Sequence, residues 1–286
     1  MVIQSGEDKE LSIRRLSSYQ YSAAGFGSGI ATRALVQPLD VLKIRFQLQE
    51  EPFKGAHGKY YGLAQALTLI KQEEGLSAFW KGHVPAQYIS AIYGLVQFSV
   101  FETLRLHLRE NVSAKRFNRT NDFVCGAIAG SSGMVVSLPF DVLRTRLVAQ
   151  GKDKIYRGMF HAIRSIWQSE GAPGFFRGIV PCLAQVAPNA GLQFSIYNQM
   201  TTLWKSISYM HNYDKTGSLL CGILAGIAAK TMVYPLDLLR HRKQVTKLTR
   251  IGFGKTTPYS NTFRLIKGII IEESMSSFLR ASCPAC

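Results

Sequence analysis

A proline followed by an aspartate two residues later and a lysine or arginine five residues later occurs three times. The copies are Pro38-Leu39-Asp40-Val41-Leu42-Lys43, Pro139-Phe140-Asp141-Val142-Leu143-Arg144 and Pro235-Leu236-Asp237-Leu238-Leu239-Arg240. On a helix, an acid and a base three residues apart share a face, and the proline kinks the helix by removing one backbone hydrogen bond. Three kinked helix ends meeting near one axis could alternate three carboxylates with three cations. In ion pairs that are shielded from water, the attraction between the charges is nearly offset by the cost of desolvating them. Such a near balance suits a gate that must open.

Two further cations precede these motifs within apolar stretches. Arg33 and Lys230 each stand seven residues before their aspartates, Asp40 and Asp237, nearly two helical turns away on the same face, whereas Met134 fills the middle place. A cation inside an apolar span is a functional-site hypothesis by default. Two convergent cations would bind a ligand with several negative charges through charge-assisted hydrogen bonds. The alternative is that both side chains snorkel to a membrane interface.

The spacing of these motifs indicates a tandem triplication. The prolines are 101 and 96 residues apart, and a G-x-x-x-G pair begins 13 residues before each, predicting close helix approach. Each unit has an apolar stretch up to the motif, at Tyr21 to Gln47, Phe123 to Ala149 and Leu219 to Lys243. The first two continue with short helices at Gly62 to Glu73 and Gly158 to Ser169, then second apolar stretches at Val84 to Val100 and Ile179 to Ile196. The apolar stretches are long enough for spans of about 20 residues, and only two residues follow Pro284 in unit three, so five spans are expected.

Composition excludes several other classes of protein. An apolar content of 47% is too high for disorder, and five cysteines form no disulfide framework or paired zinc motif. The net charge of +16 could indicate a protein that binds nucleic acid. However, the basic residues cluster after the prolines and in the loops and not along one face with aromatic residues, so no nucleic-acid partner is expected. We found no metal-binding or nucleophile motif among the six histidines and the serines, and we expect neither an enzyme nor a bound metal.

The triplicated motif, with Glu74-Gly75 leading to Trp80-Lys81-Gly82 and Glu170-Gly171 leading to Phe176-Arg177-Gly178, resembles the mitochondrial carrier family. The resemblance implies an all-α, multi-pass protein of the mitochondrial inner membrane, a pseudo-threefold six-helix barrel that works by alternating access. Here the sixth helix is apparently missing. The expected repeats are 17–110, 119–206 and 215–286, in a monomer surrounded by lipid, cardiolipin included.

The resemblance also implies roles for individual residues. At the matrix gate, Asp40 pairs with Arg144, Asp141 with Arg240 and Asp237 with Lys43. Gln47 and Gln244 match the family's glutamine brace beneath such pairs, whereas Val148 does not, so one pair should lack a hydrogen bond. Ile89 and Gln185 match substrate contact points, and successive turns on the same faces add Tyr93, Gln97, Asn189 and Gln193. A cytosolic gate retains only Glu102 and Arg105, since the matching stretch at Tyr197 to Thr201 has lost both charges, so this gate should be weak.

Several stretches are most similar to the members of this family that carry thiamine pyrophosphate. They include Ala34 to Gln49, Phe79 to Gln87 and Ala190 to Ser195. The sequence therefore predicts import of thiamine pyrophosphate as a transported substrate rather than a cofactor, in exchange for nucleotides as the resemblance implies. Two alternatives stay open: a truncated homologue that does not transport, because five spans cannot close a six-helix barrel, and a carrier of another nucleotide-like phosphate.

Overall fold

The computed structural model describes residues 18–49, 59–60, 62–111, 119–151, 154–206 and 214–245. All regular secondary structure within these ranges is helical. Residues 246–286 lie outside these ranges. The expectation that the second span of the third repeat is missing concerns those residues and is therefore not tested by the structure. The prediction of an all-α chain is confirmed for the described part.

Long helices alternate with short ones along the chain. The long helices are α2 (Ser18–Leu48), α4 (His83–Asn111), α5 (Arg119–Ala149), α7 (Ile179–Ser206) and α8 (Asp214–Gln244). The short helices are α3 (Leu63–Glu74), η1 (Leu76–Trp80), α6 (Met159–Glu170) and η3 (Ala172–Phe176). The long helices, of 28 to 31 residues, exceed the length needed to cross a bilayer. Two stretches, Val124–Ala149 and Gly217–Gln244, are also apolar enough by composition alone.

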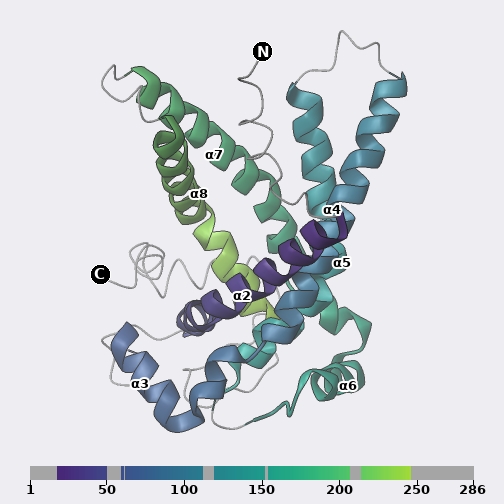
Figure 1. The fold of residues 1–286 in the computed structure, drawn as a ribbon. Helices are drawn as coiled ribbons and strands as arrows, with labels where there is room; N and C mark the ends of the chain where they lie inside the picture. The colour runs from purple at the N-terminus through teal and green to yellow at the C-terminus, as the bar shows by residue number, and fades with distance from the viewer. Residues whose placement is uncertain are drawn as a thin grey trace, which may run out of the picture.

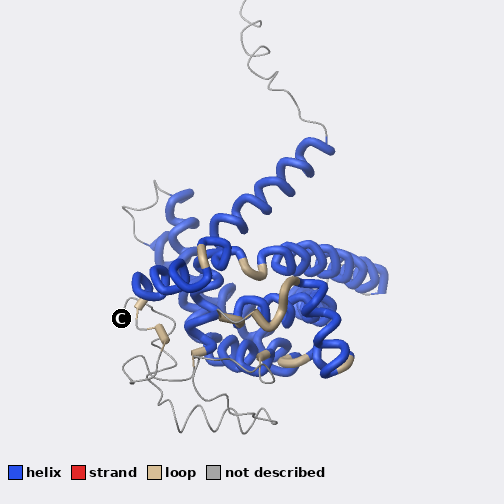
Figure 2. Tube along the Cα trace, turned by 90° about the horizontal axis from the view of Figure 1, so that it is seen from below, coloured by secondary structure: helices blue, strands red, loops and turns tan. Residues whose placement is uncertain are grey.

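Four of the five long helices form two pairs that meet at one end. Figure 1 shows α4 beside α5 and α7 beside α8, with the pairs spreading apart toward the other end. The helices α2, α5 and α8 each contain a proline, at Pro38, Pro139 and Pro235. The first half of α2 stands away from the other helices (Figure 2), and residues 27–32 are all exposed.

The kink in α2 has a side-chain replacement for its lost hydrogen bond. Pro38 has no N–H to donate to the carbonyl of Ala34, four residues earlier. The indole Nε1 of Trp80, at the end of η1, donates to that carbonyl instead at 3.1 Å. Repeat two has Phe176 at the place of Trp80, which has no such donor. The first hinge is therefore tied to its neighbouring short helix in a way that the second is not.

A hydrophobic cluster joins the three repeats near the kinks. It includes Val41, Ile44 and Leu48 of α2, Leu143 and Leu147 of α5, and Val245, which follows α8; all of these are buried. Because these apolar side chains exclude water from the helix ends, any charge held among them is desolvated.

One glycine at the start of each second span, in repeats one and two, packs closely against the next repeat. Gly82 and Gly178 have φ of 78° and 82°, a left-handed conformation that favours glycine. A methyl group at Gly178 would lie 3.2 Å from the carbonyl oxygen of Arg240, and one at Gly82 would lie 3.3 Å from that of Arg144. Each glycine therefore sets the distance between a second span and the following proline-kinked helix.

The G-x-x-x-G pairs make close helix contacts at only some positions. Gly130 faces Val186 of α7 and Tyr93 of α4, whereas no atom of the described residues lies within 4 Å of a methyl group built at Gly25, Gly29, Gly126 or Gly226. The prediction of close approach is thus confirmed at Gly130 and is wrong at those four positions in the described part of the chain. At Gly25 and Gly29 the reason is that the first half of α2 stands away from the other helices.

We expect Gly178→Ala to lower the free energy of unfolding by about 1–3 kcal/mol, from the strained φ and the contact with the Arg240 carbonyl. Gly158→Ala is the matched control, because Gly158 is extended and has open space around it. The thermal midpoint of each purified variant in detergent, followed by circular dichroism, measures the difference. Equal midpoints for the two variants would contradict the proposed packing role.

Candidate functional site

Three ion pairs form a closed ring that joins α2, α5 and α8. Arg144 Nη2 lies 2.5 Å from Asp40 Oδ2, Arg240 Nη2 lies 2.6 Å from Asp141 Oδ2, and Lys43 Nζ lies 2.7 Å from Asp237 Oδ2. Each pair joins two different repeats, so the ring connects all three. The pairing that the family resemblance implies is confirmed, and we call these six residues the charge ring.

Glutamine side chains support two of the three pairs. Gln47 Nε2 donates to Asp237 Oδ2 at 3.3 Å, and Gln244 Nε2 donates to Asp141 Oδ2. The corresponding residue beneath the third pair is Val148, which offers no donor. As predicted, one pair lacks this hydrogen bond, and its carboxylate, Asp40, keeps 39% of its side chain exposed against 6% for Asp141 and 11% for Asp237.

A second layer of buried cations lies two residues after the charge ring. Arg45 forms a bidentate pair with Glu74, with N–O distances of 2.6 and 2.8 Å, and also donates to the carbonyl oxygens of Val148 and Gln150 at the end of α5. Lys81 binds the same carboxylate at 2.5 Å. A cation at a helix C-terminus also neutralises the negative end of the helix dipole. Arg45 therefore fastens repeat one to the end of the repeat-two helix.

The same arrangement recurs around the axis. Arg146 binds Glu170 at 2.7 and 3.0 Å and donates to the carbonyl of Gln244 at the end of α8, while Arg177 binds Glu170 at 2.7 Å. Arg242 donates to the carbonyls of Gln47 and Gln49 at the end of α2, at 3.4 and 3.3 Å. Glu273, the counterpart of Glu74 in repeat three, lies outside the described residues.

Sequence reasoning missed this second layer, although a signal was present. Every copy of the motif has an arginine seven residues after its proline, at Arg45, Arg146 and Arg242. The Glu-Gly and aromatic-basic-Gly strings repeat in the first two units, and their charges need partners as well. The shared offset of the arginines predicts that they and the glutamates form one network.

The pKa of Glu74 lies below its ordinary value. Burial would raise this pKa, but hydrogen bonds and charge attraction from Arg45 and Lys81 outweigh burial. The carboxylate therefore stays ionised, and its pairs stabilise the fold at neutral pH.

The two cations expected in the cavity lie partway along their helices, near the charge ring. Arg33 on α2 interacts electrostatically with Asp40 and Arg144, and Lys230 on α8 interacts with Asp237, Lys43 and Arg240. Within the described ranges, neither forms a hydrogen bond or ion pair. Both positive charges are consequently available to a ligand that approaches the ring.

The candidate contact residues of α4 lie in different surroundings. Ile89 and Gln97 are half-buried, whereas Tyr93 packs against α5, where methyl groups at Gly130 and Gly133 would meet its hydroxyl and its ring. Tyr93 thus fills the space that these two glycines leave between α4 and α5.

The candidate contact residues of α7 reach the charge ring at one point. Gln185 is buried and its Nε2 donates to Asp237 Oδ1 at 3.3 Å. The side-chain oxygens of Gln185 and Asn189 are buried without a hydrogen-bond partner in the described part of the chain, and Gln193 is exposed. The structure therefore brings Gln185 to the ring itself and leaves Gln193 at the surface.

The expected cytosolic gate residues, Glu102 and Arg105, are both exposed on α4. The stretch from Tyr197 to Thr201 on α7 carries no charged residue. The two helices thus offer no ion pair between these positions.

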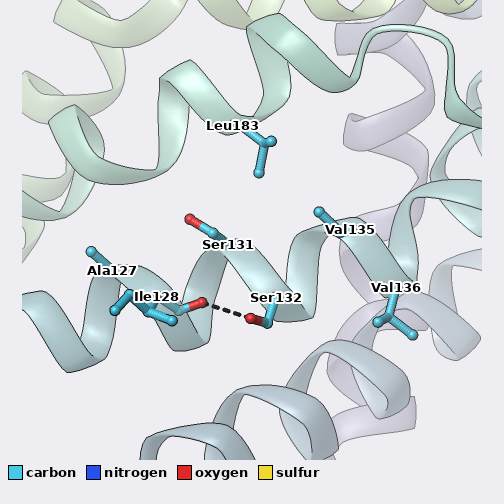
Figure 3. Close-up of a pocket in the computed structure, with 7 residues that line it drawn as sticks. All are labelled: Ala127, Ile128, Ser131, Ser132, Val135, Val136 and Leu183. Atoms are coloured by element: carbon cyan, nitrogen blue, oxygen red, sulfur yellow. Dashed lines mark hydrogen bonds between the residues drawn. The ribbon is translucent and has the colours of Figure 1, made fainter. Parts of the chain in front are cut away.

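A cavity of about 540 Å³ lies between α5 and α7 (Figure 3). Leu183 of α7 points toward α5, and the Ser132 hydroxyl donates a hydrogen bond to the carbonyl oxygen of Ile128 at 2.9 Å. Besides these three residues, the lining comprises Ala127, Ser131, Val135 and Val136. It contains no charge and does not suit a diphosphate.

One family model, described as mitochondrial carrier protein, matches the sequence three times, over residues 14–112, 115–208 and 212–286, and each match contains one helix of the charge ring. The chain belongs to the mitochondrial carrier family. The predicted fold class and location in the mitochondrial inner membrane follow from this membership, which also points to a transporter rather than an enzyme.

Curated relatives of this carrier are similar over most of its length. The human mitochondrial thiamine pyrophosphate carrier is 40% identical over 98% of this chain and 89% of its own. The mitochondrial thiamine pyrophosphate carrier 1 of Coccidioides immitis is 42% identical over 81% of this chain and 74% of its own length. The maize mitochondrial thiamine diphosphate carrier 1 is 34% identical over 98% of this chain and 91% of its own length.

We expect Glu74→Gln to destabilise the carrier by about 3 kcal/mol, because Arg45 would stay buried without its counter-charge. Glu73→Gln is the matched control: Glu73 pairs with Lys59 at 2.6 Å but is 31% exposed, against 2% for Glu74. Thermal midpoints in detergent at pH 7 measure both. Similar losses for the two variants would contradict the importance of burial.

The pair of Arg45 and Glu74 makes the stability of the fold depend on pH. Because the pKa of Glu74 is lowered in the folded protein, its contribution is full above the unfolded value of about 4.3 and is lost as pH falls through the folded value. The midpoint of the wild type should fall below pH 4 more steeply than that of Glu74→Gln. Parallel pH curves would contradict this assignment.

Proposed function

We propose that this carrier moves thiamine pyrophosphate across the mitochondrial inner membrane, by exchange with nucleotides. The observation that carries the proposal is the position of Arg33 and Lys230, two cations beside a closed charge ring that form no ion pair with any residue the structure describes. A diphosphate bears several negative charges and fits such a pair. The names of the relatives support the choice of this diphosphate over others.

The geometry supports a gating mechanism based on competition for charge. In this structure the ring is closed and the helix pairs spread apart at the other end (Figure 1). A diphosphate bound by Arg33 and Lys230 would place negative charge near Lys43, Arg144 and Arg240, and so weaken their attraction to the ring carboxylates. The ring would then open on the matrix side.

The remaining candidate contacts would bind the organic part of the substrate. Ile89, Tyr93 and Gln97 on α4 and Gln185, Asn189 and Gln193 on α7 are assigned to the aminopyrimidine and thiazolium rings, through amide hydrogen bonds and aromatic stacking. Gln185 would exchange its bond with Asp237 for one with the substrate. Glu102 and Arg105 belong to a weak cytosolic gate.

The proposal includes the surroundings of the protein. The repeats 17–110, 119–206 and 215–286 would each supply one helix of the ring to a single monomer. Lipid, including cardiolipin, would cover the outer face, and no cofactor would be required.

Counter-exchange in liposomes tests the transport function. Purified protein in liposomes loaded with unlabelled thiamine pyrophosphate should take up the labelled compound, and internal nucleotides should support the same uptake. A protein that is folded by circular dichroism but takes up no label would favour the non-transporting alternative. Uptake of labelled nucleotides without thiamine pyrophosphate would favour the other substrate class.

We expect Arg33→Gln and Lys230→Gln each to reduce thiamine pyrophosphate uptake at least about tenfold, because each removes a charge-assisted contact with the diphosphate. Arg157→Gln is the control, since Arg157 is exposed and lies outside the long helices. Initial rates, normalised to the amount of folded protein in the liposomes, measure the effect. Unchanged rates in both variants would overturn the assignment of the diphosphate site.

A further inference from the structure

A histidine in the third repeat lies inside the charge ring at a position where the other repeats have no titratable group. His241 follows Arg240 directly, and its counterparts are Ile44 and Thr145. It is buried, at 7% exposure. The charged groups that act on it are Asp237 and Arg240 of α8, Asp141 of α5 and Lys43 of α2.

A directed chain of hydrogen bonds determines which ring nitrogen carries the proton. A carboxylate only accepts, so the amide nitrogen of Gln244 must face Asp141 and its oxygen must face Thr145. Thr145 donates its single hydroxyl proton to that oxygen at 2.7 Å. Toward His241 Nδ1, 3.4 Å away, the hydroxyl can therefore only accept, and Nδ1 must bear a hydrogen.

This tautomer turns a lone pair of the neutral imidazole toward a carboxylate. His241 Nε2 lies 3.8 Å from Asp237 Oδ1. In the closed ring Asp237 already has Lys43 at 2.7 Å and Gln47 and Gln185 each at 3.3 Å. The three acids of the ring balance its three bases, and Lys230 adds a further positive charge that acts on Asp237. A positive charge on His241 would lose its hydration without gaining an unpaired carboxylate as a partner. His241 is therefore neutral in the closed ring.

Opening of the ring changes this balance. Lys43 and Gln47 both belong to α2, so Asp237 loses both when α2 moves away from α8, and water enters. Asp237 and His241 are four residues apart on the same helix and stay together. A proton from the solvent bound at Nε2 would then supply the counter-charge that Lys43 no longer provides.

We propose that His241 is a positioning residue of the matrix gate, which takes up a proton at Nε2 when the ring opens and replaces Lys43 as the partner of Asp237. The inference rests on the proposed carrier function. Since the open ring binds the proton more tightly than the closed ring, opening is favoured as pH falls through the range in which histidine titrates.

Transport at two pH values tests this role. His241→Asn retains a donor for Thr145 but cannot titrate. Between pH 8 and pH 6 on both faces, the ratio of wild-type to His241→Asn exchange should rise about threefold or more. Titration of the substrate's own phosphate affects both proteins and cancels in this ratio. His83→Gln, outside the ring, should behave as the wild type; a constant ratio for His241→Asn would overturn the proposal.

A spectroscopic test does not depend on transport. In detergent, ¹⁵N spectra of histidine-labelled protein should show one residue, assigned by its loss in His241→Asn, as the Nδ1–H tautomer and neutral at pH 6. In Lys43→Gln, where Asp237 lacks its cation, the same residue should be protonated at pH 6. An Nε2–H tautomer in the wild type, or no change in Lys43→Gln, would overturn the proposal. An exchange-inactive wild type with the expected spectra would count against the transport function alone.

Discussion

The requirement that buried charges be neutralised where three helices meet governs this structure. Apolar side chains exclude water at the kinks, so each carboxylate needs a cation close by, and the nearest one belongs to another repeat. A charge without its partner would be costly there. The repeats are thus held in a circle by electrostatic complementarity, and the same dependence on partners allows an incoming anion to disturb the circle.

The threefold pattern is regular in its backbone and uneven in its supporting side chains. Each repeat supplies a kinked helix, an ion pair in each direction and an arginine directed at the end of the following helix. The supports differ: Trp80 replaces a lost backbone bond in repeat one, Val148 leaves one pair unbraced, and His241 enters the ring only in repeat three. These differences give each repeat its own set of contacts with the charge ring.

Much of this arrangement could be predicted from the sequence, because repetition in register reveals which residues must be equivalent. The positions of the long helices follow from counting residues from the prolines, and the three ion pairs and the unbraced pair follow from the family resemblance applied to those counts. Contacts between repeats could not be counted in this way: the approach of Tyr93 to the glycines of α5, and that of Gln185 to Asp237, depend on how the helices cross. The open surroundings of Gly25 and Gly29 likewise depend on which helix lies nearby.

The exposure of Asp40 distinguishes its pair from the other two. Dissolved ions screen charges in contact with water over roughly 8 Å at physiological ionic strength, but have little access to carboxylates as buried as Asp141 and Asp237. Salt would accordingly loosen the junction of repeats one and two before either of the others. A nominally symmetric arrangement would then come apart in a fixed order, and the ionic strength of the surroundings would set how readily its first junction parts.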